Sequence, residues 1–362
     1  MSAKIPLFKV LMSDTVTASI NEAIRSGTIT EGPRVQTFEQ ELSLILGGPV
    51  LTVNSGTTAL HLAAVLLDLR PGDEIISTPI TCAATNLALL HAGATIVWAD
   101  VDPLTGLIDP GSVAEKKTPR TKAVMAVDWA GRVCDPRMLV EAAGGVPMIE
   151  DAAHAFCAQR PSDLPSMVCW SFQAIKHLTT GDGGGLYVRD EALREKARRL
   201  RWFGIDRQQP GPNIDKSIFE AGYKYHMNDL DASIGLANLP LACKAVEAHR
   251  TNAAWYGEAL KDVRGIRVPP QDPASAWWLY TILLEANDRQ RDFIDFMDSR
   301  NIECSRVHSR NDVHPVFANT IKSVLPGVDY FDTHQVAIPV GWWISNDDRR
   351  RVAEAVHDWS QT

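Results

Sequence analysis

Short apolar runs alternate with stretches of helical periodicity from about residue 50 to residue 190. Neighbouring parallel strands need a crossover between them, and that crossover is usually a helix. The alternation therefore predicts an α/β fold whose mostly parallel sheet, of the seven-stranded type, has helices on both faces. The expected strands are VLTV (50–53), EIIST (74–78), TIVWADV (95–101), AVMAV (123–127), PMIED (147–151), VCWSF (168–172) and GGLYVRD (184–190). The expected helices are 57–69, 82–93 and 190–204.

The pattern changes toward the C-terminus. Residues 205–227 are polar and rich in Gly and Pro, which predicts a loop. Helical patterns run from about 229 to 262, and we expect an interruption near Pro240. The remainder mixes expected strands (277–285, 302–308) with expected helices (289–301, 347–359). We therefore predict a large domain with an N-terminal arm over residues 1–245 and a smaller α+β domain over residues 246–362.

Composition and charge exclude several classes of function. The formal net charge of −8 argues against nucleic-acid binding, which requires a basic face. No run of 18 apolar residues is present, so we expect no membrane span, and the N-terminus has no apolar core of a signal peptide. The six cysteines show no CxxC pairing. They are expected to be free thiols in a reducing cytoplasm, and we predict no metal site.

The stretch SFQAIKHLTTGDGGG (171–185) contains one lysine, Lys176. This lysine could clamp a phosphate, act as a covalent catalyst or lie on the surface. A P-loop needs its glycines before the lysine, and here they follow it, so that motif is excluded. The expected strand VCWSF ends just upstream. Ser171 and Lys176 should therefore leave the sheet together at its carboxyl edge, where open parallel sheets bind ligands.

A second motif, NSGTT (54–58), joins an expected strand to an expected helix. The first N–H groups of a helix are free and lie at the positive end of its dipole, so the motif is a good anion cradle. An ordinary Ser/Thr N-cap with a turn glycine explains it equally well. The dinucleotide motif GxGxxG is absent from this turn.

A third motif, EDAAH (150–154), puts Asp151 at the carboxyl end of an apolar run and His154 three residues later. Taken alone, Asp151 is better interpreted as the cap of a following helix. Together, the three motifs bring an anion cradle, a carboxylate and a lysine to one sheet edge. Pyridoxal phosphate enzymes need these groups: a lysine for the Schiff base, an acid for the ring nitrogen and donors for the phosphate. The combination favours pyridoxal phosphate as the cofactor.

These residues resemble a known family, the DegT-type nucleotide-sugar aminotransferases, which are fold type I pyridoxal phosphate enzymes. The resemblance implies an aspartate aminotransferase-like large domain, a small C-terminal domain and a homodimer with shared active sites. It rests on seven segments: SGTITEGPRVQTFEQEL (26–42), NSGTTALHLA (54–63), EDAAHAFCA (150–158), SFQAIKHLTTGDGGG (171–185), IECSRVHSRNDVHPVF (302–317) and AIPVGWW (337–343) of the small domain, and GYKYHMNDLDASIGL (222–236). The last resembles the segment that reaches into the neighbouring subunit's site.

The resemblance also implies roles for individual residues. Lys176 would form the Schiff base and then carry a proton between the cofactor and the sugar, and Asp151 would pair with the pyridinium nitrogen. The other expected cofactor contacts are His154 at the 3-hydroxyl, Gly56, Thr57 and Ser171 at the phosphate, Cys82 where relatives often carry a stacking aromatic, and Lys224 where they often carry Asn. Expected substrate contacts are Asp182, Arg306 and His308. For Arg306, His308, Arg310 and His314, solvated charges are an equally good interpretation.

The implied reaction transfers an amino group, with glutamate as the expected donor, to a keto-sugar linked to a nucleoside diphosphate. Its expected setting is cytoplasmic aminosugar synthesis for a polysaccharide or O-antigen. Two alternatives stay open: a nucleotide-sugar dehydratase and a non-catalytic cofactor-binding regulator of the same fold. Dehydratases of the family carry histidine in place of the lysine, so Lys176 argues for transamination although His177 adjoins it. A desulfurase would need a cysteine on a polar loop, and Cys304 lies on an expected strand.

Overall fold

The computed structural model describes residues 3–161, 165–207, 209, 212, 216–218 and 220–362. The strands of its main sheet are β1 (Val50–Val53), β2 (Glu74–Ser77), β3 (Thr95–Trp98), β4 (Thr121–Val127), β5 (Met148–Asp151), β6 (Met167–Ser171) and β7 (Gly184–Val188). Their order is β1-β7-β6-β5-β4-β2-β3. Strand β7 pairs antiparallel with β1 and β6, and the other neighbours pair in parallel. The predicted α/β fold with a mostly parallel sheet is confirmed.

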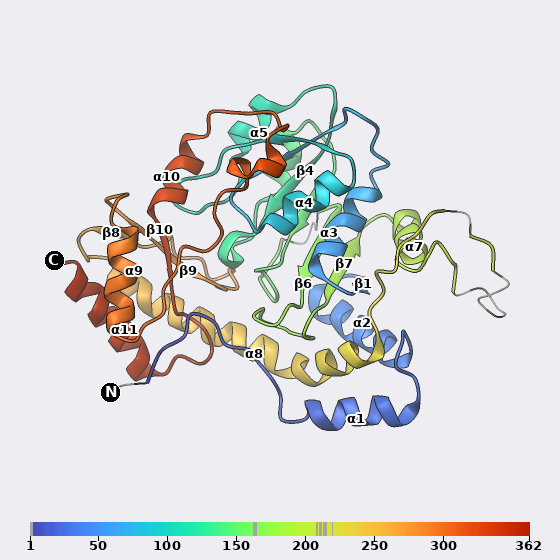
Figure 1. The fold of residues 1–362 in the computed structure, drawn as a ribbon, viewed down its shortest axis with the longest axis horizontal. Coiled ribbons are helices and arrows are strands. Elements are labelled where there is room, and N and C mark those ends of the chain that lie inside the picture. Colours follow the sequence, from blue (N-terminus) through green and yellow to red (C-terminus); the bar gives the residue numbers. More distant parts are fainter. Residues whose placement is uncertain (1–2, 162–164, 208, 210–211, 213–215, 219) are drawn as a thin grey trace.

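Both faces of this sheet are apolar, and helices cover both of them (Figure 1). One face packs against α3 (Gly56–Val65), α4 (Ala83–His91) and α7 (Glu191–Leu200). The other packs against α5 (Pro110–Lys116), α6 (Pro136–Ala142), α2 (Pro33–Leu46) and α8 (Asp229–Leu260). Successive strand residues serve opposite faces, so Ile75 packs in the first cluster and Ile76 in the second.

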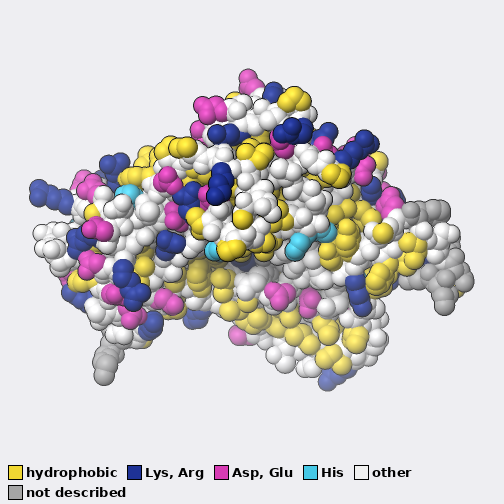
Figure 2. All heavy atoms as spheres, turned by 45° about the horizontal axis from the view of Figure 1, so that its top comes forward, with side chains coloured by type: hydrophobic (Ala, Val, Ile, Leu, Met, Phe, Trp, Pro, Cys, Tyr) yellow, Lys and Arg dark blue, Asp and Glu magenta, His cyan; other side chains and the backbone are white. Residues whose placement is uncertain are grey.

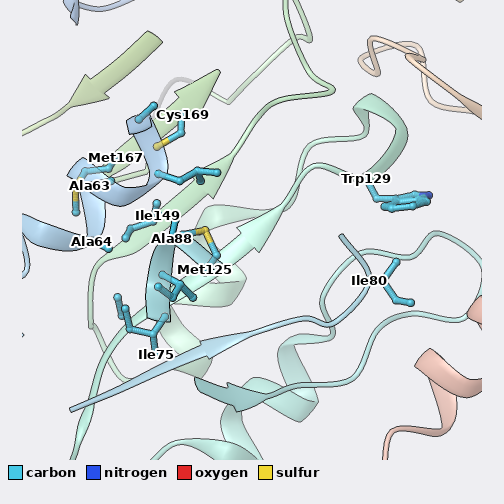
Figure 3. Close-up of a cluster of buried hydrophobic side chains, with 14 of the residues drawn as sticks. Ala63, Ala64, Ile75, Ile80, Ala88, Met125, Trp129, Ile149, Met167 and Cys169 are labelled. Carbon is cyan, nitrogen blue, oxygen red and sulfur yellow. The ribbon is translucent and has the colours of Figure 1, made fainter. Parts of the chain in front are cut away.

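Small side chains bring α3 and α4 close to the strands. Figure 3 shows Ala63 and Ala64 of α3 and Ala88 of α4 beside Ile75, Met125 and Ile149 of the sheet. All of these residues are fully buried. This close packing fixes the position of the N-terminus of α3 relative to the ends of the strands.

The C-terminal part contains a second, antiparallel sheet in the order β10-β9-β8. Its strands are β8 (Ile266–Arg267), β9 (Tyr280–Leu284) and β10 (Gln335–Ile338), and the helices around it are α9 (Gln290–Ser299), α10 (Pro326–His334) and α11 (Asn346–Trp359). The N-terminal segment runs against this part: Ile5 bridges Ile302, and Trp343 Nε1 donates to the Pro6 carbonyl at 3.0 Å. It then leads to α1 (Val16–Ser26), which lies beside α8 (Figure 1).

Two predictions about the C-terminal half are wrong. The helix expected to break near Pro240 is continuous, because α8 contains this proline in its interior. Residues 302–308 form no strand and make only isolated bridges, of Ile302 with Ile5 and of Ser305 with Ala337. In the predicted loop 205–227, Ile205 bridges Ile218, while residues 208, 210–211, 213–215 and 219 lie outside the described part.

The predicted boundary between 1–245 and 246–362 falls inside α8. Leu239 and Ala242 of this helix pack under the main sheet, whereas Ala253 and Tyr256 pack in the core of the small sheet. The helix crosses the molecule from one sheet to the other (Figure 1). The division into two domains at residue 245 stays a prediction.

The surface carries charges of both signs. On the face in Figure 2, lysines and arginines lie among aspartates and glutamates, with hydrophobic side chains between them. No helix in the described ranges has both the length and the apolar character to cross a bilayer.

Candidate active site

A cavity of about 250 Å³ lies at the carboxyl ends of β5 and β6. The structure brings most of the predicted site residues to its walls. These are Gly56, Thr57, Cys82, Asp151, His154, Ser171, Lys176, Asp182 and His308. Trp278, just before β9, is a further wall residue that the sequence did not indicate. The cavity therefore lies between the main sheet and the C-terminal part of the chain.

The N-terminus of α3 forms one end of this cavity. Ser55 caps the helix by accepting from the Thr58 N–H at 3.1 Å. The N–H groups of Gly56 and Thr57 belong to the first turn and have no acceptor within the helix. A Cβ on Gly56 would come within 2.8 Å of the Ser171 Cβ, and one on Gly184 within 2.6 Å of the Ser55 carbonyl oxygen. The two glycines therefore let a helix N-terminus lie directly against the ends of β6 and β7. The N-cap is present, and the helix N-terminus lies at the cavity, where the predicted anion cradle would be.

Asp151, the last residue of β5, is only 4% exposed. Its Oδ2 accepts from Thr85 Oγ1 at 2.6 Å, and its Oδ1 accepts from the Ala153 N–H at 3.1 Å. Thr85 in turn shares a 2.7 Å hydrogen bond with Thr81. Burial raises the pKa of Asp151, and its hydrogen bonds and Lys176 oppose that rise. No helix follows in residues 152–161, so the interpretation of Asp151 as a helix cap is wrong.

Lys176 is partly buried and lines the cavity. Its Nζ lies over the indole of Trp278, 3.6 Å from the ring centroid. Loss of hydration lowers the pKa of Lys176 from 10.5 to about 8, while Asp151 opposes this shift. The neighbouring His177 is not among the wall residues and packs instead on His249, with ring centroids 4.7 Å apart.

Two histidines continue the aromatic wall around Trp278. The His154 ring stacks on Trp278 at 3.9 Å, and the His308 ring lies parallel to His154 at 5.8 Å. Burial and the charge of Lys176 lower the pKa of both, that of His308 to about 4, so both imidazoles are neutral at pH 7. His308 has a φ of +57°, a strained conformation for a residue with a side chain. His154 Nδ1 and His308 Nε2 are buried without a hydrogen-bond partner.

Other predicted residues lie outside the cavity. Lys224 is exposed, and its carbonyl accepts from Asn54 Nδ2 at 3.2 Å. The contact predicted for Lys224 is with a neighbouring subunit's site, and it stays a prediction. Arg306 bonds to Ser309 Oγ at 2.6 Å and lies 3.7 Å from Asp332, while Arg310 pairs with Asp312 at 2.7 Å. For Arg306 and Arg310, the interpretation as solvated charges with local partners fits better than a substrate contact within this chain.

Sequence reasoning missed the residues that support the site. Asn86 of α4 donates to Asn311 Oδ1 at 2.8 Å, and Asn311 Nδ2 donates to the Thr81 carbonyl at 2.9 Å. All three residues are buried. This network therefore attaches the C-terminal segment to the loop that precedes Thr85, the residue that donates a hydrogen bond to Asp151. Isolated asparagines in a sequence give no signal for such pairing. The doubled tryptophan 277–278 before an apolar run was visible but indicated only a strand.

The residues present fit pyridoxal phosphate. The glycine-lined N-terminus of α3 suits a phosphate group. Asp151 is a buried carboxylate whose hydrogen-bond donors are uncharged, so a protonated ring nitrogen would be a suitable charged partner for it. The unpartnered Nδ1 of His154 offers a hydrogen bond to a ring oxygen. These residues and Lys176 are the ones that would hold the cofactor.

Residues 11–357 match the DegT/DnrJ/EryC1/StrS aminotransferase family. The chain belongs to this family. The expected resemblance is thus confirmed, and so is the enzyme class, a pyridoxal phosphate-dependent sugar aminotransferase.

Individual relatives agree with this assignment. The spore coat polysaccharide biosynthesis protein SpsC of Bacillus subtilis is 31% identical over 94% of this chain and 92% of its own length. The structure of AtS13 from Actinomadura melliaura is similar over 99% of both chains, with 37% identity and a TM-score of 0.93. The sugar aminotransferase CalS13 from Micromonospora echinospora is similar over 98% of this chain and 99% of its own, with 34% identity and a TM-score of 0.91.

Proposed function

We propose that this aminotransferase moves an amino group from glutamate to a 3-keto- or 4-keto-sugar linked to a nucleoside diphosphate. The observation that carries the proposal is the position of Lys176, the lysine among the cavity wall residues, beside the buried Asp151 and the cradle at α3. Similarity to the sugar aminotransferase CalS13 and to the polysaccharide biosynthesis protein SpsC supports a sugar substrate.

Each of these residues has a chemical task in the proposal. When bound, pyridoxal phosphate supplies an electron sink for the carbon that loses a proton. The N–H groups of Gly56 and Thr57, with the Ser171 hydroxyl, would hold its phosphate. The Asp151 carboxylate would stabilise positive charge at its ring nitrogen. Lys176 Nζ, with a pKa of about 8, loses its proton far more readily than an ordinary lysine, so it can take a proton from one carbon and return it to another.

The structure bears on the alternative of a dehydratase. In that reaction a histidine would stand where the lysine stands. Lys176 lines the cavity here, whereas His177 packs away from it on His249. This arrangement favours transamination. A non-catalytic regulator is disfavoured because Lys176 and Asp151 are both present and brought together.

The proposal includes a homodimer with shared active sites, in which Lys224 of one subunit serves the other's cofactor phosphate. The exposure of Lys224 supports this role because its side chain is available to a partner. All six cysteines are free, which is consistent with the proposed cytoplasmic location.

A panel of nucleotide-linked keto-sugars tests the function. Each is incubated with the enzyme, pyridoxal phosphate and glutamate, and mass spectrometry follows conversion of ketone to amine with formation of 2-oxoglutarate. We expect one sugar class to react. Lys176→Ala should abolish turnover, and Lys117→Ala, at an exposed lysine, should not. Turnover by Lys176→Ala, or release of water without amine transfer by the native enzyme, would refute the proposal.

A further inference from the structure

Trp278 contacts the nitrogen atom on which the proposed chemistry depends. The Lys176 Nζ lies 3.6 Å from the centroid of its ring, well inside the range of a cation–π interaction. Such an interaction favours the ammonium form over the neutral amine, and it is strongest where water is excluded. Trp278 is only 4% exposed, so this contact is made away from bulk solvent.

The indole of Trp278 is held on several sides. Its Nε1 donates to the carbonyl of Ile175, the residue before Lys176, at 3.0 Å. The Phe8 ring stacks on it at 5.0 Å and the His154 ring at 3.9 Å. The tryptophan therefore cannot change its orientation without breaking contacts with the N-terminal segment, the loop after β5 and the lysine's own backbone. A ring fixed in this way can hold a flexible lysine side chain in one place.

The charges around Lys176 do not explain its placement by themselves. Asp151 attracts the ammonium, and Cys82 acts in the same direction. His154 and His308 line the same cavity, His177 follows Lys176 in the chain, and burial keeps all three neutral. No carboxylate in the described part of the chain forms an ion pair with Lys176. The indole ring of Trp278 is in direct contact with its nitrogen.

We propose that Trp278 is a positioning residue for Lys176, whose indole holds the free ε-amino group in the cavity whenever that group is not covalently engaged. The proposal rests on the proposed function for its kinetic consequence only, because the contact itself exists without cofactor. A lysine released into a cavity without such a contact would sample many rotamers. The indole face restricts it to a place from which its nitrogen can return to the reacting carbon.

The test measures the reactivity of Lys176 in the cofactor-free enzyme. The protein is treated briefly with acetic anhydride over a range of pH, and peptide mass spectrometry gives the fraction of Lys176 acetylated. We expect half-maximal reactivity in the native enzyme near the pKa of about 8. In Trp278→Leu the midpoint should fall by roughly one pH unit, because the ammonium loses its aromatic partner. Trp278→Phe, which keeps a ring, should stay close to the native value.

Trp277→Leu is the matched control. Trp277 is also 4% exposed, but its Nε1 donates to the Asp272 carbonyl and it stacks on Tyr280, away from the cavity. Its loss should lower thermal stability without moving the Lys176 midpoint. An unchanged midpoint in Trp278→Leu, or an equal shift in Trp277→Leu, would overturn the proposal.

Kinetics of the cofactor-loaded enzyme separate positioning from substrate binding. For Trp278→Leu we expect kcat to fall at least tenfold with a smaller change in KM for the keto-sugar, and Trp278→Phe should restore part of kcat. A rise in KM alone would show that the indole is a sugar contact and would also overturn the proposal. If no keto-sugar reacts with the native enzyme, the proposed function fails, while the acetylation profile still decides the role of Trp278.

Discussion

At the scale of the residue, burial sets the chemistry of Lys176. An exposed lysine is protonated at neutral pH and cannot accept a proton. Loss of hydration brings the pKa of Lys176 to about 8, and Asp151 limits the fall. The two groups adjust each other, because burial makes the charged form of each costly unless the other is charged. This balance depends on where the residues lie and not on their identity alone.

This pKa shift predicts a pH-dependent stability. Because the folded-state pKa is below the unfolded value of 10.5, the unfolded chain binds more protons between pH 8 and 10.5, so stability rises with pH in that window. This difference between the two pKa values corresponds to as much as about 3 kcal/mol of unfolding free energy. In urea unfolding of the cofactor-free protein, the free energy of unfolding of the native chain should rise relative to that of Lys176→Met from about pH 8 upward. The exposed Lys117→Met is the control, and a pH-independent difference for Lys176→Met would contradict the assigned shift.

At the scale of the element, the contact of α3 with β6 and β7 depends on glycines. The helix N-terminus lies so close to the strands that no room remains for a Cβ at Gly184 or Gly56. In contrast, Pro240 does not break α8, although it removes one helical hydrogen bond. Leu239, Ala242 and Val246 bury their side chains on either side of it. Tertiary packing therefore holds the helix together where local propensity predicts an end.

Gly184→Ala tests the helix–strand contact. Its Cβ would lie 2.6 Å from the Ser55 carbonyl oxygen, so the N-terminus of α3 must move away from β7. We expect unfolding free energy to fall by about 1–3 kcal/mol and the affinity for pyridoxal phosphate to fall with it, as measured by thermal unfolding and by absorbance titration. The atoms nearest to the Cβ of Gly185→Ala would be side-chain atoms of Val50, Phe172 and Trp170 and not backbone atoms, so this change should cost less. Equal affinities in the two variants would show that the cradle does not depend on this contact.

At the scale of the whole molecule, the site is assembled from segments far apart in the sequence. Gly56, Asp151 and Lys176 come from the main sheet with its helices and loops, and Trp278 and His308 come from the C-terminal part. Phe8 of the N-terminal segment packs on Trp278 from outside the cavity. Lys224 lies on the surface, where the proposed dimer would bring it to a second cavity.

Complementation tests the shared site. Lys176→Ala and Lys224→Glu should each lose most activity as homodimers. When the two variants are expressed together, a mixed dimer contains one site with a native Lys176 and a native Lys224, so activity should return. Co-purification of the second variant through a tag on the first shows that mixed dimers have formed. If Lys224→Glu retains full activity, or mixing restores none, then Lys224 does not act across subunits.

The sequence alone predicted the sheet type and brought Asp151 and Lys176 to the sheet edge where the cavity lies. Apolar runs of strand length record which segments are buried, and motifs such as EDAAH and SFQAIK lie at strand ends, where their place follows from the direction of the chain. Tertiary structure alone decided that Trp278 contacts Lys176, that Asn311 bonds to Asn86, that 302–308 forms no strand and that α8 passes through Pro240. These outcomes depend on contacts between residues distant in sequence. Local periodicity carries no information about such contacts, because it reports only whether a side chain is buried and not what covers it.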